Sequence, residues 1–218
     1  MRRIRAGGLY TMMVVGCLNV FECEATIGKT LRSIQNFVDR IIVVDGAYEG
    51  FSDHARSRDG TMVKVRGFPK PKILIGNDKH WHSQIKKRNQ YLAPVFVDNG
   101  EWLFIIDGDE HIQSGVDETL AFLEESKDRF HKVSLLTPDG AKYGEHVRLI
   151  RYDETMKYEG NHCCITYMDG IKKAHIRGTT PCTLAPLQVI HDQSKRTPEY
   201  QANMQRYVQT RNEAGVPK

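Results

Sequence analysis

The sequence lacks several features that would place it in a common class. No apolar run approaches the ~20 residues that a membrane-spanning helix needs, and there is no internal repeat or low-complexity tract. No G-x-G-x-x-G motif follows an expected strand, which excludes a dehydrogenase with the usual dinucleotide-binding turn. The five cysteines include no C-x-x-C pair, so we expect reduced thiols rather than a disulfide framework or a zinc finger.

What is present is typical of a globular enzyme. The 218 residues are 40% hydrophobic and 27% charged, and the formal net charge of +4 suits anionic ligands such as nucleotide phosphates. Arg2, Arg3 and Arg5 precede an apolar run that ends at Cys17, a pattern similar to a lipoprotein signal. Cleavage there would remove the buried strand expected at 12–18, so a strand is favoured. We therefore predict a cytoplasmic protein, with peripheral membrane association as the open alternative.

Strand and helix patterns alternate in the first half of the chain. Apolar β-branched runs predict strands at 12–18, 40–45, 72–75 and 102–106, and helical spacing predicts helices that begin at Thr26, span 83–93 and surround 116–123. The second half predicts strands at 132–137, 146–152, 160–167 and 187–190, and a helix at 198–212. This order favours an α/β fold with a mostly parallel, mixed central sheet flanked by helices.

Carboxylates follow two of the expected strands. Asp45 ends the second strand, and Asp107 and Asp109 follow the fourth with only Gly108 between them. In an extended chain, residues i and i+2 point to the same side, so Asp107 and Asp109 should converge at the edge where open α/β sheets bind ligands. Two carboxylates that close repel each other unless a cation intervenes, which indicates a divalent metal that holds a phosphorylated substrate.

The order of several motifs is more specific than any one of them. They are Val38-Asp39-x-Ile41-Ile42-Val43-Val44-Asp45-Gly46, Asp59-Gly60-Thr61, Lys87-Arg88-Asn89, Asp107-Gly108-Asp109-Glu110, Val147-Arg148-Leu149-Ile150-Arg151, Tyr158-Glu159-Gly160 and Ile190-His191. In this order they resemble a GT-A-fold glycosyltransferase of the inverting family 2 type. The resemblance implies a single Rossmann-like GT-A domain over 1–218. Its nucleotide-sugar-binding half would be 12–112, its acceptor half 113–193, and its C-terminal helix and tail 194–218.

The resemblance also implies roles for individual residues. Donor-binding roles fall on Asn19, Glu22, Asp45, Lys87, Arg88 and Asp107. Asp45 would bind the nucleotide base, Lys87 and Arg88 the base or diphosphate, and Asp107 the ribose, directly or through the metal. Asp109 and His191, with Asp107, would hold Mn²⁺ or Mg²⁺. The donor would be a nucleotide-diphosphate sugar, with a UDP-sugar favoured.

The acceptor half is less determined. Relatives commonly carry His-Glu where this chain has His162-Cys163, so Glu110, Glu159 and His162 are the candidates for the general base, and a retaining mechanism stays open. A glycan, a lipid-linked sugar, a protein or modified DNA bases are all compatible acceptors. The rival hypotheses are a phosphatase that uses Asp107 as nucleophile, and a degenerate GT-A domain that binds a sugar nucleotide or a partner without catalysis.

Overall fold

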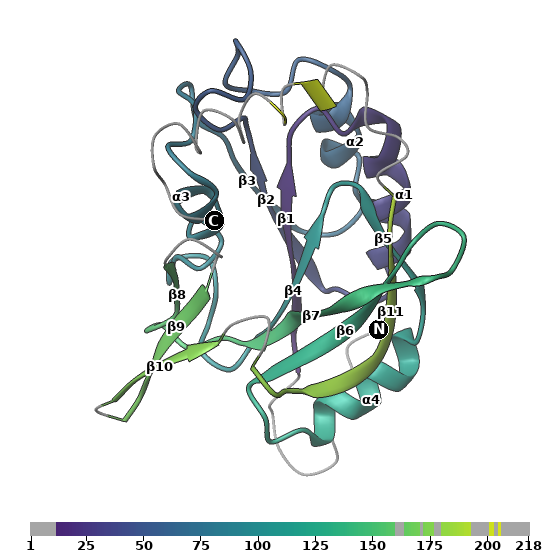
Figure 1. Cartoon of the computed structure of the whole chain (residues 1–218), viewed down its shortest axis with the longest axis vertical. Helices are drawn as coiled ribbons and strands as arrows, with labels where there is room; N and C mark the ends of the chain where they lie inside the picture. Colours follow the sequence, from purple (N-terminus) through teal and green to yellow (C-terminus); the bar gives the residue numbers. More distant parts are fainter. Residues whose placement is uncertain are drawn as a thin grey trace.

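The chain forms an α/β structure (Figure 1). This computed structural model describes residues 12–159, 164–170, 172–176 and 180–192, together with residues 201, 202 and 205. The first elements are β1 (Val14–Val20), α1 (Glu24–Ile34), β2 (Arg40–Asp45), α2 (Thr61–Arg66), β3 (Lys72–Ile75), α3 (Gln84–Arg88) and β4 (Trp102–Asp107). They are followed by β5 (Glu110–Ser114), α4 (Val116–Glu125), β6 (Phe130–Leu136), β7 (Lys142–Arg151), β8 (Lys157–Glu159), β9 (Cys164–Asp169), β10 (Lys172–Ile176) and β11 (Thr183–His191).

Eight of the described strands form one mixed sheet in the order β3-β2-β1-β4-β7-β6-β11-β5. The first four strands are parallel neighbours, and β6 is parallel to β11. Strand β7 is antiparallel to β4 and β6, and β5 is antiparallel to β11. A smaller antiparallel sheet, β10-β9-β8, lies beside the main sheet (Figure 1). The predicted α/β fold with a mixed central sheet is confirmed.

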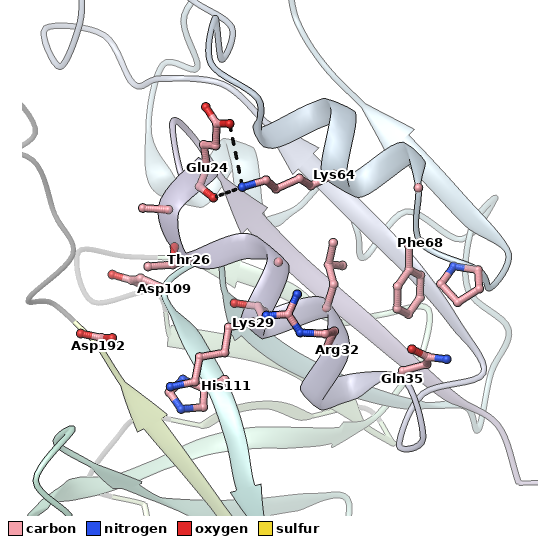
Figure 2. A pocket seen from close by; sticks show the side chains of 16 residues that line it. Glu24, Thr26, Lys29, Arg32, Gln35, Lys64, Phe68, Asp109, His111 and Asp192 are labelled. Atoms are coloured by element: carbon pink, nitrogen blue, oxygen red, sulfur yellow. Dashed lines mark hydrogen bonds and ion pairs between the residues drawn. The ribbon is translucent and has the colours of Figure 1, made fainter.

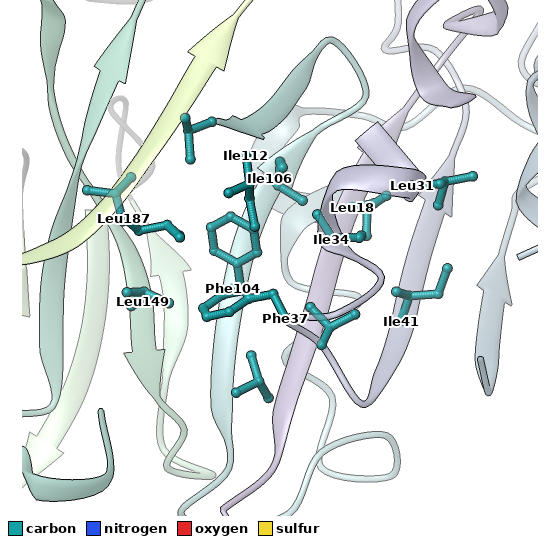
Figure 3. Packing of buried hydrophobic residues seen from close by; sticks show 14 of the residues in the cluster. Leu18, Leu31, Ile34, Phe37, Ile41, Phe104, Ile106, Ile112, Leu149 and Leu187 are labelled. Carbon is teal, nitrogen blue, oxygen red and sulfur yellow. The ribbon is translucent and has the colours of Figure 1, made fainter. Parts of the chain in front are cut away.

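Alternating side chains give the main sheet two buried faces. On β4, Trp102, Phe104 and Ile106 belong to one buried cluster with apolar residues of α1, α2 and α4. Figure 3 shows Phe104 and Ile106 in this cluster with Leu31 and Ile34 of α1. Leu103 and Ile105 point to the opposite face, which is covered by the segment after α3 and by the small sheet. The near-continuous apolar strands therefore reflect burial on both sides of the sheet, as is usual for parallel strands.

Several boundaries differ from the predicted ones. Helix α1 begins at Glu24 rather than after a Thr26 cap, because Cys23 N donates to Thr61 Oγ1 (2.7 Å) and Glu24 N donates to Asp59 Oδ2 (3.0 Å). These cap partners are distant in sequence, so local spacing does not reveal them. Strands β5, β8 and β10 and helix α2 were not predicted, and β1 lies two residues later than expected.

The helix predicted over 83–93 is also shorter than expected. Its Ser83 cap is confirmed, since Lys86 N donates to Ser83 Oγ at 3.2 Å. It ends at Arg88 because the next residue, Asn89, pairs with the backbone of Tyr158 on β8 through bonds of 2.7 and 3.0 Å. The helix predicted at 198–212, and the start of the strand predicted at 160–167, lie outside the described residues.

Among the described helices, none is both long and apolar enough to cross a membrane.

Candidate active site

A cavity of about 620 Å³ lies at the carboxyl ends of β1, β2 and β4. This edge is where open α/β sheets bind ligands, and the volume falls in the range of small-molecule sites. Its lining includes five of the predicted site residues: Asn19, Glu22, Lys87, Asp107 and Asp109. Three other predicted residues lie next to the lining. Asp45 precedes the lining residue Gly46 in the chain, Arg88 pairs with Asp107, and His191 lies beside Asp109.

The Asp107-Gly108-Asp109-Glu110 segment is a tight turn between β4 and β5. The expectation that Asp107 and Asp109 point to one side of a single extended strand is therefore wrong, because the chain turns at Gly108. Gly108 N donates to Asn19 O (3.2 Å), and Gly108 O accepts from Thr26 Oγ1 (2.7 Å) and Thr30 Oγ1 (3.1 Å). The two carboxylates still line the same cavity because β1 and α1 hold the turn in place.

The close approach of this turn to Cys23 leads to a stability prediction. A Cβ atom at Gly108 would lie 2.8 Å from Cys23 Sγ and 3.1 Å from Cys23 Cβ. We expect Gly108→Ala to lower the free energy of unfolding by about 1–3 kcal/mol in urea denaturation, since overpacking shifts the backbone. Cys23→Gly removes both contact atoms and leaves a residue tolerated at a helix N-cap. The double variant should recover most of the loss relative to Cys23→Gly alone; an equal loss in both backgrounds would contradict the steric explanation.

Two arginines hold the carboxylates of the turn. Arg88 Nη2 lies 3.3 Å from Asp107 Oδ1, and Arg148 Nη1 lies 3.7 Å from Asp107 Oδ2. Arg148 Nη2 also donates to Glu110 Oε1 (2.5 Å), while Glu110 Oε2 accepts from Asp107 N (2.9 Å). Burial raises the pKa of Glu110 to about 7, although the charge of Arg148 opposes this. Because the Glu110 side chain has no exposed surface, it supports the turn and is poorly placed to meet an acceptor hydroxyl.

Asp109 faces His191, which ends β11. The distance between Asp109 Oδ2 and His191 Nε2 is 3.6 Å, and the Tyr143 ring lies against the imidazole with centroids 5.5 Å apart. Neighbouring ligands of one six-coordinate Mg²⁺ lie about 3 Å apart, so this carboxylate and imidazole fit two positions of one ion after a small closure. Among the described residues, no three His, Cys, Asp or Glu side chains form a metal-binding group. Two protein ligands suffice for Mg²⁺ where phosphate oxygens and water complete the shell.

Asn19 and Lys87 provide polar groups on the cavity floor. Asn19 is 7% exposed, and neither its Oδ1 nor its Nδ2 has a hydrogen-bond partner among the described residues. An unsatisfied buried amide costs about 1–3 kcal/mol, so a ligand that bonds to Asn19 would regain that energy. Lys87 Nζ donates to the carbonyls of Val20 and Gly46, both at 2.8 Å, which leaves one of its three N–H donors for a ligand. Burial lowers the pKa of Lys87 to about 8, and Asp45 opposes the shift.

Asp45 and Glu22 hold the long loop that follows β2. Asp45 accepts from Ser57 Oγ (2.6 Å) and Ser57 N (3.2 Å), so a nucleotide base would have to share this carboxylate. Glu22 Oε1 pairs with His54 Nε2 at 2.7 Å, and His54 Nδ1 pairs with Asp53 Oδ1 at 2.5 Å. Asp45 and Glu22 therefore attach this loop to the wall of the cavity.

The His54 contacts lead to a prediction of pH dependence. Burial, the largest influence, lowers the pKa of His54, but hydrogen bonds to Asp53 and Glu22 outweigh it and raise the pKa above 6.5. The folded state therefore binds the proton more tightly than the unfolded state, and this contribution to stability is present below pH 6.5 and lost as pH rises through the folded pKa. We expect His54→Gln to show a smaller decline in unfolding free energy over that pH window than the unmodified protein. An equal decline in His54→Gln and in the unmodified protein would contradict this explanation.

Of the remaining candidates for the general base, Glu159 lies in the described part of the chain. Glu159 pairs with Lys157 (2.6 Å) and Lys173 (2.5 Å), and these hydrogen bonds lower its pKa to about 2. A carboxylate this acidic is a weak base near neutral pH. His162 lies outside the described residues.

Sequence reasoning assigned no role to Arg148, Ser57 or His54. Arg148 is 9% exposed between Val147 and Leu149 on an otherwise apolar stretch, and a charged residue in such a strand is the one local sign of a buried partner. Ser57 and His54 lie in a loop whose fold depends on contacts with β1 and β2, so the sequence carries no comparable sign for them.

No family model matches the chain, and no curated protein matches it. Among solved structures, residues 1–349 of S. aureus TarS are similar at 19% identity and a TM-score of 0.48, over 59% of this chain and 37% of that one; TarS was also solved with UDP and with UDP-GlcNAc. Glucosyl-3-phosphoglycerate synthase from Mycobacterium tuberculosis, in complex with Mn²⁺, UDP and glucosyl-3-phosphoglycerate, is similar at 16% identity and a TM-score of 0.40, over 58% and 44% of the two chains. HddC from Yersinia pseudotuberculosis shows 10% identity and a TM-score of 0.40, over 90% and 100%. The chain thus spans about a third of the TarS fragment.

Proposed function

We propose that this protein is a metal-dependent glycosyltransferase that moves a sugar from a nucleotide-diphosphate donor to a hydroxyl acceptor. The observation that carries the proposal is the cavity at the ends of β1, β2 and β4, where Asp109 and His191 lie 3.6 Å apart and a buried Asn19 amide has no partner among the described residues. The motif order described above supports the same function. A UDP-sugar is the favoured donor.

In the proposed reaction, the bond between the anomeric carbon and the diphosphate oxygen breaks, and its electron pair leaves with the nucleoside diphosphate. The acceptor oxygen forms the new bond to that carbon, and its proton passes to a base. Asp109 and His191 would hold Mn²⁺ or Mg²⁺, which when bound neutralises charge on the diphosphate. Lys87 would donate its remaining N–H to the donor, and Asn19 would satisfy its amide there.

The roles of Asp107 and Arg88 follow from their ion pair. Arg88 and Arg148 already face the Asp107 carboxylate. Asp107 would therefore bind the ribose or the metal while it stays paired with these two guanidinium groups. Glu22 and Asp45 would shape the donor site through the loop that they hold. His162 is the preferred base over Glu159, whose pKa of about 2 is unfavourable for that role.

The decisive experiment is a panel of nucleotide diphosphates and their sugars, each with and without Mn²⁺ or Mg²⁺. We expect one nucleotide to raise the melting temperature in a metal-dependent manner, because a ligand that binds only the folded state stabilises it. The corresponding sugar nucleotide should then release nucleoside diphosphate, by slow hydrolysis or with an acceptor. Stabilisation by UDP that survives Asp109→Ala, with no turnover, would instead indicate a binding domain without catalysis.

A further inference from the structure

A second cavity of about 620 Å³ follows the outer side of α1, between α2 and β5 (Figure 2). It shares five lining residues with the first cavity: Glu24, Ala25, Thr26, Lys64 and Asp109. The two cavities therefore meet at the start of α1, beside the proposed metal ligand Asp109. We call the second cavity the α1 groove.

The α1 groove contains two cationic side chains that have no hydrogen-bond or ion-pair partner among the described residues. Lys29 and Arg32 are exposed on α1 and line the groove, and neither forms a hydrogen bond or ion pair with any residue that the structure describes. Like charges three residues apart on a helix repel each other, so they cost stability unless an anion lies between or beside them. Lys64 differs, because its Nζ donates to Glu24 O at 2.7 Å.

Gly28 leaves space for the side chains of Arg32 and Lys64. A Cβ atom at Gly28 would lie 3.4 Å from Arg32 Nη1 and 3.8 Å from Lys64 Cδ, so both side chains extend over the glycine. On the other side of α1, the His111 imidazole lines the groove and is 7% exposed.

The charges of the α1 groove are unevenly distributed along its length. Glu24, Asp109 and Asp192 lie toward the end that adjoins the first cavity, whereas Arg32 lies farther along α1 (Figure 2). An anion would be repelled at the acidic end and attracted along α1. A molecule with a neutral hydroxyl end and an anionic end fits this pattern.

We infer that the α1 groove binds an acceptor that carries a phosphate group. The phosphate would lie on Lys29 and Arg32, the guanidinium offering paired N–H donors to its oxygens, and the hydroxyl would point toward Asp109. The identification of the bound molecule as an acceptor rests on the proposed function. The binding of phosphate itself can be measured separately.

The test uses the full chain labelled with ¹⁵N and titrated with glucose 6-phosphate, with glucose as the neutral comparison. We expect the amide signals of Gly28, Lys29 and Arg32 to shift with glucose 6-phosphate only. Loss of two charge-assisted contacts in Lys29→Ala/Arg32→Ala should weaken binding at least about tenfold. The matched control Arg66→Ala/Lys79→Ala removes the same charge from exposed positions outside the groove and should keep the affinity. Unmoved α1 signals, or an equal loss in the control, would overturn the inference.

A second arm separates the possible sources of the phosphate. Co-sedimentation with phosphatidylglycerol vesicles that is lost in Lys29→Ala/Arg32→Ala but kept in the control would assign a lipid headgroup; binding of glucose 6-phosphate alone would assign a soluble sugar phosphate. Nucleotide-dependent thermal stabilisation should be unchanged in the double variant. If no nucleotide stabilises any variant, the proposed function fails, while the phosphate titration still decides whether the α1 groove binds this anion.

Discussion

Asp109→Asn is expected to lower the rate of nucleoside diphosphate release by at least about a hundredfold, since a metal that neutralises a leaving diphosphate supplies several kcal/mol and each 1.4 kcal/mol is roughly tenfold. The reason is that Asp109 and His191, 3.6 Å apart, are the pair that we propose to hold the ion. The measurement is release of nucleoside diphosphate from the sugar nucleotide that stabilises the protein. Metal-dependent thermal stabilisation should fall in the same variant.

Glu118→Gln is the matched control, because Glu118 is an exposed carboxylate on α4 away from both cavities. It should leave the rate and the thermal shift unchanged. His191→Ala should behave like Asp109→Asn, although less severely if water replaces the imidazole. An Asp109→Asn protein that retains its metal-dependent rate would refute the metal site.

Arg148→Met is expected to lower the free energy of unfolding by about 3–5 kcal/mol, because breaking a buried ion pair leaves the remaining charge without compensation. The remaining charge is Glu110, whose Oε1 lies 2.5 Å from Arg148 Nη2 and whose side chain has no exposed surface. Methionine keeps much of the apolar volume, so the loss reports on charge. Urea denaturation above pH 7 measures it, because the pKa of Glu110 is about 7 and the carboxylate has to be charged.

Two comparisons make this prediction specific. Glu110→Gln keeps an oxygen for Asp107 N and removes the charge, so the double variant Arg148→Met/Glu110→Gln should recover most of the lost stability. Arg129→Met breaks a partly exposed pair with Asp153 at 3.1 Å and should cost at most about 1 kcal/mol. Equal losses in Arg148→Met and in the double variant would contradict the unpaired-charge explanation.

Much of the fold could be predicted because the information is local. The β-branched runs that became β2, β3 and β4 carry their burial in their own residues, and Ser83 caps α3 through a bond three residues away. Strand β5 was missed because Glu110–Ser114 is short and polar in sequence, and it becomes a strand only by pairing with β11. The cap of α1 was missed for the same reason, since Asp59 and Thr61 reach it through space.

The sequence by itself determined which polar residues stand at the ends of the buried strands, and that an α/β sheet would bring several of them to one edge. Five of the predicted residues line one cavity there, and two of them, Asn19 and Asp107, do so because the parallel strands β1 and β4 end together. Only the tertiary structure decided that Asp107 pairs with Arg88 and Arg148, and Asp45 with Ser57, whereas the proximity of Asp109 to His191 was expected from the family resemblance. The physical reason is that strand periodicity is a local property, whereas the partner of a buried charge is set by elements that meet only after folding.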